Sequence, residues 1–310
     1  MASHGAATAS SRARARVLLF GAGLLFGLAA VLARLATAGG MSGGQATFAR
    51  FVVGLVAISL VFLARPGAFR ARNLPLLAAR GLFGGLAALL YFQAIARIPA
   101  GEATLLNNTF PIWAVIISFA VLGERPTIHL ALALAVASAG VFLALGGGRL
   151  PRALGAGELL AIASAVLAGA AVTTIRALRA DPGSPIVFFA FTLGSLLVSA
   201  PSALAPWPTA PLPWVAAAGV GVVAFLAQLS MTEAYGALSV AEAAIWQQLT
   251  PLASFVLALT IGERLTPVAL VGVLIGVSGV AYGALLGHRP RAGSPPALRE
   301  AAAGLPAEEP

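Results

Sequence analysis

Two stretches of the chain carry the same order of polar residues through apolar sequence: GEATLLNNTFPIWAVIISFAVLGERPT at residues 101–127 and AEAAIWQQLTPLASFVLALTIGERLT at residues 241–266. Each contains a Glu-Ala pair, an amide pair, a proline and a Gly-Glu-Arg turn that is followed by Thr. The matched residues lie 140 positions apart up to the proline and 139 positions apart at the turn. In a sequence this rich in apolar residues, matches between apolar residues are expected by chance. Matches between polar residues that follow in the same order at nearly the same spacing are not. The chain therefore contains an internal duplication.

The composition around these stretches is that of a membrane protein. The 310 residues are 59% hydrophobic and 9% charged, with a mean hydropathy of +0.95, whereas a soluble domain carries about 25% charged residues. Apolar stretches of about 20 residues are long enough to span a bilayer as helices. The sequence predicts an all-α polytopic membrane protein with ten transmembrane helices, at residues 17–37, 45–64, 74–95, 102–122, 128–146, 157–175, 184–202, 212–234, 241–261 and 266–286.

The duplication divides these spans into two repeats of five, at residues 17–148 and 155–287. An odd number of spans makes the second repeat enter the membrane from the opposite side. The prediction is therefore an inverted repeat with a pseudo-two-fold axis in the membrane plane, an arrangement that suits alternating access. Residues 1–16 are expected to form a cytoplasmic tail, and the Pro-, Ala- and Glu-rich residues 288–310 a disordered cytoplasmic tail.

The arginines set the expected orientation. If the N-terminus is cytoplasmic, 12 arginines fall in inner segments and 4 in outer loops, an asymmetry that places both termini inside. All 19 basic residues are arginine, which together with the abundant alanine indicates a GC-rich bacterial genome and hence the bacterial cytoplasmic membrane. The net charge of +9 comes from arginines that are scattered between the apolar runs. This distribution is typical of the loops between membrane spans and not of a basic face that binds nucleic acid, so we expect no nucleic-acid partner.

The repeated stretches also resemble a known family. The residues from Tyr91 and Gln93 through Glu102–Ala103 and Phe110–Pro111 to Leu122–Arg125 are similar to the EamA domain of the drug/metabolite transporter superfamily, and those from Ala234–Tyr235 to Gly262–Arg264 are similar to a second such domain. The resemblance covers about residues 17–286. It implies ten helices and secondary transport, usually export, of small metabolites such as amino acids, or of drugs. A non-transporting, membrane-embedded interaction or assembly subunit is the alternative.

Polar residues within the spans are the candidates for a substrate pathway. The amide pairs Asn107–Asn108 and Gln247–Gln248 match by repeat and lie inside apolar helices, where an unpaired polar group is costly. They are expected either to bond between helices or to line a wet cavity, which Pro111 and Pro251 would widen by kinking both helices. The full candidate set comprises Arg50, Tyr91, Gln93, Asn107, Asn108, Gln228, Glu233, Glu242, Trp246, Gln247 and Gln248.

Several charged candidates have two interpretations. Arg50 lies within a span, where it could attract a substrate carboxylate or pair with a helix end. Arg80 is expected to snorkel toward the inner surface. Glu233 is the most deeply placed carboxylate by this register, so it is the first candidate for coupling to protons. Glu242 is expected to line a pathway mouth with Trp246 on the same helix face.

The remaining motifs indicate structure and no catalysis. The turns at Gly123–Glu124 and Gly262–Glu263 are predicted to end one helix and begin the next, with the glutamates in favourable contact with helix ends. No histidine lies in mid-span beside a serine or an acidic partner. The chain has no cysteine, no metal-ligand spacing and no phosphate-binding loop, so the sequence predicts no enzyme, metal or cofactor.

Overall fold

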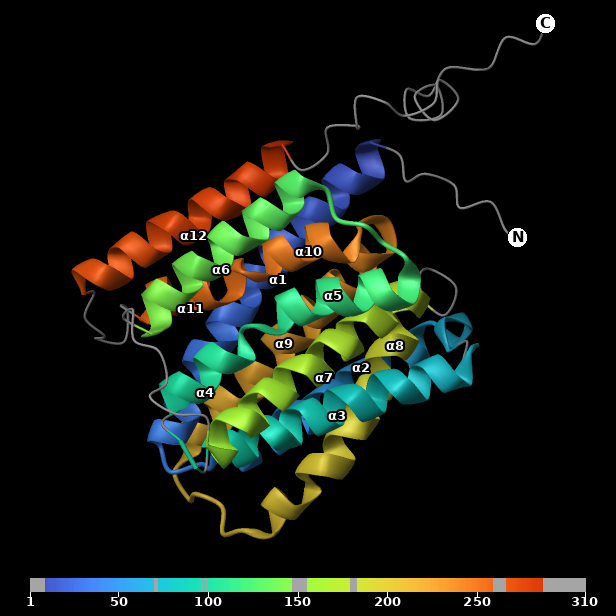
Figure 1. Ribbon diagram of the computed structural model, residues 1–310. Helices are drawn as coiled ribbons and strands as arrows, with labels where there is room; N and C mark the ends of the chain where they lie inside the picture. The colour runs from blue at the N-terminus through green and yellow to red at the C-terminus, as the bar shows by residue number, and fades with distance from the viewer. Residues whose placement is uncertain are drawn as a thin grey trace, which may run out of the picture.

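The computed structural model describes residues 9–69, 72–95, 97–98, 100–146, 155–178, 183–258 and 266–286. Within these ranges every regular element is a helix (Figure 1). The helices are α1 (Ala9–Ala38), α2 (Gly43–Ala64), η1 (Pro66–Ala68), α3 (Leu74–Ile95), α4 (Ala100–Asn107), α5 (Phe110–Leu122), α6 (Ile128–Gly146), α7 (Ala156–Leu178), α8 (Gly183–Ser199), η2 (Ala200–Leu204), α9 (Pro211–Ala237), α10 (Val240–Gln247), α11 (Leu249–Ala258) and α12 (Pro267–Leu286).

Eight helical stretches of the described chain are long and apolar enough to cross a membrane, and a shorter apolar helix lies at Ile128–Ala144. Large apolar side chains remain on the outside of the bundle, among them Leu197 (78% exposed) and Leu285 (80% exposed). Exposed apolar surface on this scale requires lipid around it. The protein is therefore an all-helical, multi-pass membrane protein.

Two of the expected spans are interrupted. The stretch 102–122 is divided between α4 and α5, and the stretch 241–261 between α10 and α11. In both cases the helix stops at the amide pair, because α4 ends at Asn107 and α10 ends at Gln247. The sequence predicted a kink in each of these spans, whereas the structure has a break between two shorter helices.

The prolines give the physical reason for both breaks. Pro111 is the second residue of α5, and Pro251 is the third residue of α11. A proline has no backbone N–H and clashes with the carbonyl four residues before it. The carbonyls that lose their helical donor in this way are those of Asn107 and Gln247. Both breaks therefore leave backbone acceptors beside the amide side chains.

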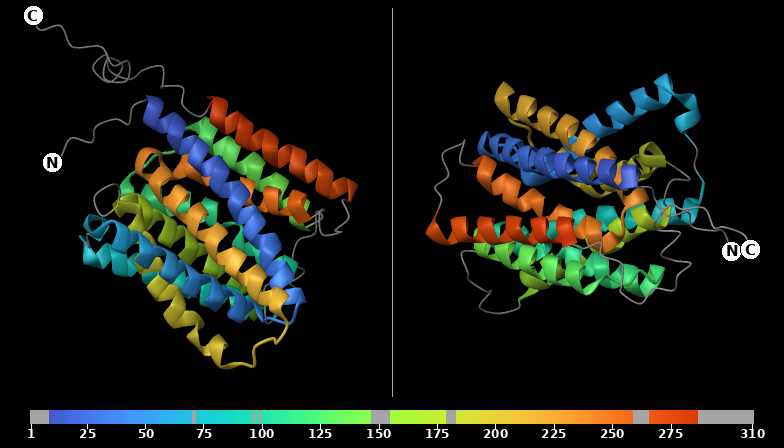
Figure 2. Two further views of the ribbon diagram at one scale, coloured as in Figure 1. Left: turned by 180° about the vertical axis from the view of Figure 1, so that it is seen from behind. Right: turned by 90° about the horizontal axis from the view of Figure 1, so that it is seen from above.

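Long-range packing pairs helices that are far apart in sequence. The main contacts join α1 to α9, α3 to α7 and α6 to α12, and α2 also packs on α8 (Figures 1 and 2). The α6–α12 contact is close because glycines face one another, and a Cβ atom on Gly140 would collide with the backbone of Gly276. Small residues allow such close approach between membrane helices.

The ends of α1 and α12 distinguish the two ends of the bundle. Helix α1 begins and α12 finishes at the same end, which we call the proximal end (Figure 1). The α1–α2 turn, at residues 39–42, lies at the distal end. Each helix that follows can be placed from these two reference points.

Candidate functional site

A cavity of about 400 Å³ lies in the middle of the bundle. Residues from α1, α2, α3, α4, α5, α7, α8, α9, α10 and α11 contribute to its wall. Arg50 of α2 and Phe191 of α8 complete this wall. The polar part of the wall comprises Arg50, Arg80, Asn107, Asn108, Gln228, Gln247 and Thr250.

Arg80 is a cavity residue that sequence reasoning missed. Its side chain is only 4% exposed, so the prediction that it snorkels to the surface is wrong. The guanidinium carbon lies 4.1 Å from the ring centroid of Phe191, and a Cβ atom on Gly84 would lie only 2.9 Å from Arg80 Nη1. Gly84 is one helical turn beyond Arg80 and therefore leaves the space that the guanidinium occupies.

Arg50 borders the same cavity from α2. Its guanidinium carbon lies 4.8 Å from the ring centroid of Phe51. The Phe51 and Phe191 rings contact each other edge to face, with centroids 5.2 Å apart. The two arginines thus rest on aromatic rings that pack together, an arrangement that favours cations through the ring quadrupole.

The amides of the first broken helix are partly anchored to their neighbours. Asn107 donates from Nδ2 to Ser164 Oγ at 2.8 Å, and Ser164 donates in turn to the carbonyl of Ala87 at 2.7 Å. These bonds connect α4 to α7 and α3. Asn107 therefore serves both interpretations of the sequence, since it bonds between helices and also borders the cavity.

The amides of the second broken helix point in different directions. Gln247 borders the cavity and donates to Met231 Sδ at 2.7 Å. Gln248 is 1% exposed and donates to Ser138 Oγ of α6 at 2.8 Å. Gln248 is absent from the described cavity wall, whereas Gln228 of α9 borders it and its Nε2 has no hydrogen-bond partner in the described part of the chain.

A second cavity, of about 290 Å³, adjoins the first toward the distal end. The two cavities share Arg50 and Phe191, and Tyr91 lines only the second. Its wall also includes Thr37 near the end of α1 and Gly43 at the start of α2, both of which are exposed. The two adjoining cavities therefore reach from the centre of the bundle to exposed residues at the distal end.

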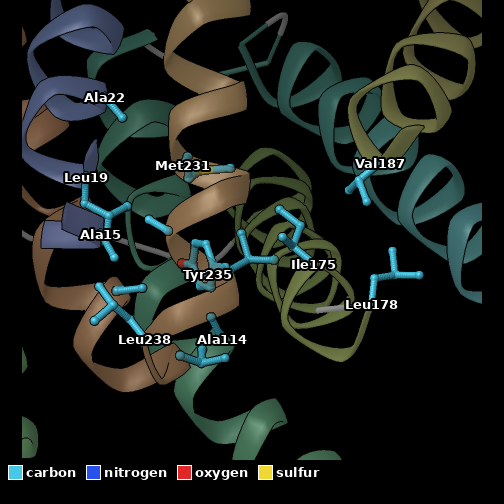
Figure 3. Close-up of a cluster of buried hydrophobic side chains, with 14 of the residues drawn as sticks. Ala15, Leu19, Ala22, Ala114, Ile175, Leu178, Val187, Met231, Tyr235 and Leu238 are labelled. Carbon is cyan, nitrogen blue, oxygen red and sulfur yellow. The ribbon is translucent and has the colours of Figure 1, made fainter. Parts of the chain in front are cut away.

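Toward the proximal end the bundle is packed with apolar side chains. Leu19 of α1, Ile175 of α7, and Met231 and Tyr235 of α9 converge there with Leu238, as Figure 3 shows. Tyr235 and Leu238 are completely buried. We call these five residues the apolar plug. Met231 also borders the central cavity, so the plug lies on the proximal side of that cavity.

Ion pairs lie beyond the plug at the proximal end. Arg16 Nε is 2.9 Å from Glu242 Oε1, and the Glu242 side chain is 1% exposed. Ser239 caps the same helix by accepting the N–H of Glu242 through Oγ at 3.2 Å. Arg14 Nη2 lies 2.6 Å from Glu233 Oε1, in a pair whose side chains are 73% and 48% exposed.

These pairs change the interpretation of both glutamates. Glu233 lies at the surface of the bundle, where it is half exposed and paired with Arg14, and it does not border the central cavity. The reason is that α9 continues to Ala237 and α1 begins at Ala9, which together bring Arg14 to the outside of the bundle beside it. Neither Glu233 nor Glu242 belongs to the described wall of the central cavity.

The first Gly-Glu-Arg turn joins the same proximal cluster. Gly123 ends α5 with a left-handed conformation, at φ 68°, which glycine adopts without strain. Glu124 Oε1 accepts from Arg176 Nε at 2.7 Å, and Oε2 accepts from the N–H of Val240 at 2.9 Å. Glu124 therefore contacts the first residue of α10, where a carboxylate is favoured by the helix dipole. The second turn, Gly262–Glu263, lies outside the described residues.

The remaining candidates lie away from the cavity. Gln93 is exposed and accepts from Arg97 Nη1 at 2.6 Å. Trp246 is partly buried and packs against two apolar clusters, one of which contains Val240 and the other Ile245. Among the described residues no group of three or more His, Cys, Asp or Glu side chains could hold a metal ion.

Comparison with known proteins places this arrangement in context. The family model described as "EamA-like transporter family" matches residues 14–146 and again residues 155–283. A solved crystal structure superposes with a TM-score of 0.77 at 23% identity, covering 90% of this chain and all of the other, which supports the fold alone.

Two curated relatives are exporters by name. The "Pseudopaline exporter CntI" of Pseudomonas aeruginosa (strain UCBPP-PA14) is 28% identical over 196 residues, which is 62% of this chain and 68% of the relative. The "Probable terminal-alkyne amino-acid exporter" of Streptantibioticus cattleyicolor is 32% identical over 221 residues, which is 68% of this chain and 73% of the relative. With a family model that matches nearly the whole described bundle in two copies, the chain belongs to the EamA-like transporter family.

Proposed function

We propose that the protein exports small metabolites across the bacterial cytoplasmic membrane by alternating access through the central cavity. The observation that carries the proposal is the asymmetry of the pathway. The polar cavity continues to exposed residues at the distal end, whereas the apolar plug and the ion pairs close the proximal end. A carrier held in one of its two access states has this form. The two relatives named as exporters support the direction of transport.

The proposed carrier has ten spans in two inverted repeats, at residues 17–148 and 155–287. In this scheme α4 with α5 and α10 with α11 each form one broken span. The helix contacts support the pairing of the repeats: α1 packs on α9 as α7 packs on α3, and α1 packs on α11 as α7 packs on α5. Because each repeat makes the same contacts with the other, each could adopt the conformation that the other has now, which is the change that alternating access requires.

The proximal end is proposed to be cytoplasmic. The arginine asymmetry supports this orientation, since Arg14, Arg16 and Arg176 all lie at the proximal end. An alkaline phosphatase fusion after Gly287 is expected to be inactive, and a fusion after Gly40 is expected to be active. The reverse pattern would overturn the orientation.

Protons are the proposed coupling ion, and the structure favours a role at the ion pairs rather than in the cavity. Loss of the negative charge on Glu242 would remove the attraction to Arg16 and so loosen the proximal end. Efflux from proteoliposomes should then rise when an opposing proton gradient is imposed. Equal efflux with and without the gradient would contradict proton coupling.

The cavity also bears on the alternative of a non-transporting subunit. Such a subunit would have a packed centre with its amides bonded to one another, whereas Asn107 bonds to Ser164, Gln248 bonds to Ser138, and about 400 Å³ is left open. These observations favour the carrier.

Transport is tested directly with a substitution that fills the cavity. Ala168 lines the cavity on α7, and Ala131 is exposed on α6. Metabolites in the medium are compared between a deletion strain and strains that express the wild type, Ala168→Trp or Ala131→Trp. Export is expected from the wild type and from Ala131→Trp, and it should be lost with Ala168→Trp at equal protein level. Identical media from the deletion and wild-type strains would overturn the proposed function.

A further inference from the structure

The positive charge of the central cavity has no counterpart in the described protein. Two arginines border the cavity, and the described part of its wall contains no Asp or Glu. The four acidic side chains that the structure describes are all engaged elsewhere. Three form ion pairs at the proximal end, and the fourth accepts the N–H of Gly155 at 2.9 Å: they are Glu124, Glu233, Glu242 and Glu158.

An uncompensated guanidinium in the middle of a membrane protein is unfavourable. Arg80 is 4% exposed, and its Nε has no hydrogen-bond partner among the described residues. Stacking on Phe191 compensates only a part of this cost, since a desolvated cation–π contact contributes about 2 kcal/mol. The arrangement is that of a site whose missing component is an anion.

We propose that the cavity binds the carboxylate of a small amphipathic metabolite, with Arg80 and Arg50 supplying the positive charge. The inference rests on the proposed export function and adds the chemical class of the substrate. A guanidinium presents N–H donors in a planar arrangement that matches a carboxylate. Arg80 lies over the Phe191 ring and borders the cavity, so its donors are within reach of a ligand there.

The rest of the wall indicates how such a substrate would lie. The face formed by α1 and α7 is apolar and consists mainly of small residues, among them Ala29, Ala33, Ala168 and Val172. The charged end of the ligand would face α2, α3 and α8, and its apolar body would lie along α1 and α7. Gln228, whose buried Nε2 lacks a protein partner, supplies a further donor from α9.

The test compares acids with matched compounds that lack the negative charge. Proteoliposomes of the full chain are loaded with an equimolar mixture of amino acids, their N-acetyl derivatives, and the carboxamides of both, and efflux is followed by mass spectrometry against protein-free liposomes. A hydrogen bond to a charged group corresponds to about tenfold or more in binding. The wild type is therefore expected to release the carboxylates at least about tenfold faster than their carboxamides.

Substitutions assign this preference to the cavity. Arg80→Gln and Arg50→Gln are expected to reduce the acid-to-carboxamide ratio toward one, and Arg80→Lys to retain part of it because the charge remains. Arg125→Gln, which removes an exposed arginine outside the cavity, should keep the wild-type ratio.

Two outcomes would overturn the inference, and they are distinguishable. Release of carboxamides as fast as acids by the wild type would refute the carboxylate site while leaving the export function intact. If the wild type releases none of the compounds, and the media of the deletion and wild-type strains are also identical, both the carboxylate site and the export function are refuted. Should Arg80→Gln fail to fold, Arg50→Gln and the wild-type ratio still decide the question.

Discussion

Glu124 joins three helices through its two carboxylate oxygens. Oε1 accepts from Arg176 Nε of α7 at 2.7 Å, and Oε2 accepts from the N–H of Val240 at the start of α10 at 2.9 Å. Arg176 extends the connection, since its Nη1 donates to the carbonyl of Tyr235 at 3.0 Å. Glu124 at the end of α5 thus binds α7 and α10 directly, and Arg176 connects them to α9, on the proximal side of the apolar plug.

We predict that Glu124→Gln opens the proximal end. Both oxygens of Glu124 make charge-assisted hydrogen bonds, each worth about 1.5–3 kcal/mol. Glutamine keeps one acceptor oxygen and no charge, so at least one of these bonds is lost, and the proximally open state should be favoured at least about tenfold. The chain contains no cysteine, so Ala168→Cys places a single thiol in the cavity. Labelling by an impermeant maleimide from the cytoplasmic side should accelerate in Glu124→Gln.

The exposed pair at the same end provides the control for this experiment. Glu233→Gln breaks the bond to Arg14, whose side chain is 73% exposed, and surface pairs contribute about 0–1 kcal/mol. Labelling in Glu233→Gln should therefore remain within a few-fold of wild type. Equal acceleration in both variants, or none in Glu124→Gln, would contradict the role given to Glu124.

A second prediction concerns stability at the buried pair. Arg16→Ala leaves the carboxylate of Glu242 at 1% exposure without this guanidinium, and truncation of one partner of a buried pair costs at least about 2 kcal/mol. The free energy of unfolding in detergent should fall by this amount. Arg14→Ala, at the exposed pair, should lower it by less than about 1 kcal/mol, and similar losses in the two variants would be inconsistent with the difference in burial.

The sequence predicted the membrane class and the family but not the direction of individual side chains. Composition and span length identify a helical membrane protein, because the bilayer fixes both. The depth of Arg80 follows from its position in the span, but its direction does not. That direction depends on Gly84 and on Phe191, which lies more than a hundred residues further along the chain.

The sequence alone did not predict the breaks in the two helices, for a related reason. Prolines are tolerated in membrane helices when neighbouring groups satisfy the freed carbonyls, so Pro111 and Pro251 alone predict no more than a bend. The partners Ser164 and Ser138 that anchor the adjoining amides come from other helices. Repeat matching therefore identified where the two spans are interrupted, and only the packing shows what each amide contacts.

Gly84→Ala should impair the arginine site without disrupting the fold. A Cβ atom at this position would lie 2.6 Å from Phe191 Cδ2 and 2.9 Å from Arg80 Nη1, so the ring and the guanidinium must both move. We expect weaker uptake into the site, measured as an increase of at least about fivefold in the half-saturating concentration of a carboxylate substrate, which corresponds to about 1 kcal/mol. Gly21→Ala is the matched control, since a Cβ atom there meets nothing within 4 Å. An unchanged half-saturating concentration in Gly84→Ala would show that the space beside Gly84 is not needed for substrate binding.

Replacing the prolines at the two breaks should stabilise the protein and slow transport. Pro111→Ala and Pro251→Ala restore N–H groups that can reach the carbonyls of Asn107 and Gln247, at the ends of the preceding helices α4 and α10. Each variant is expected to unfold at a higher temperature and to transport more slowly, because the acceptors at the cavity become occupied. Pro75→Ala, at the second residue of α3, should change neither property, since residues 72–73 before it are not helical and α3 does not continue an interrupted helix. Faster transport in Pro111→Ala or Pro251→Ala would show that the breaks do not serve the pathway.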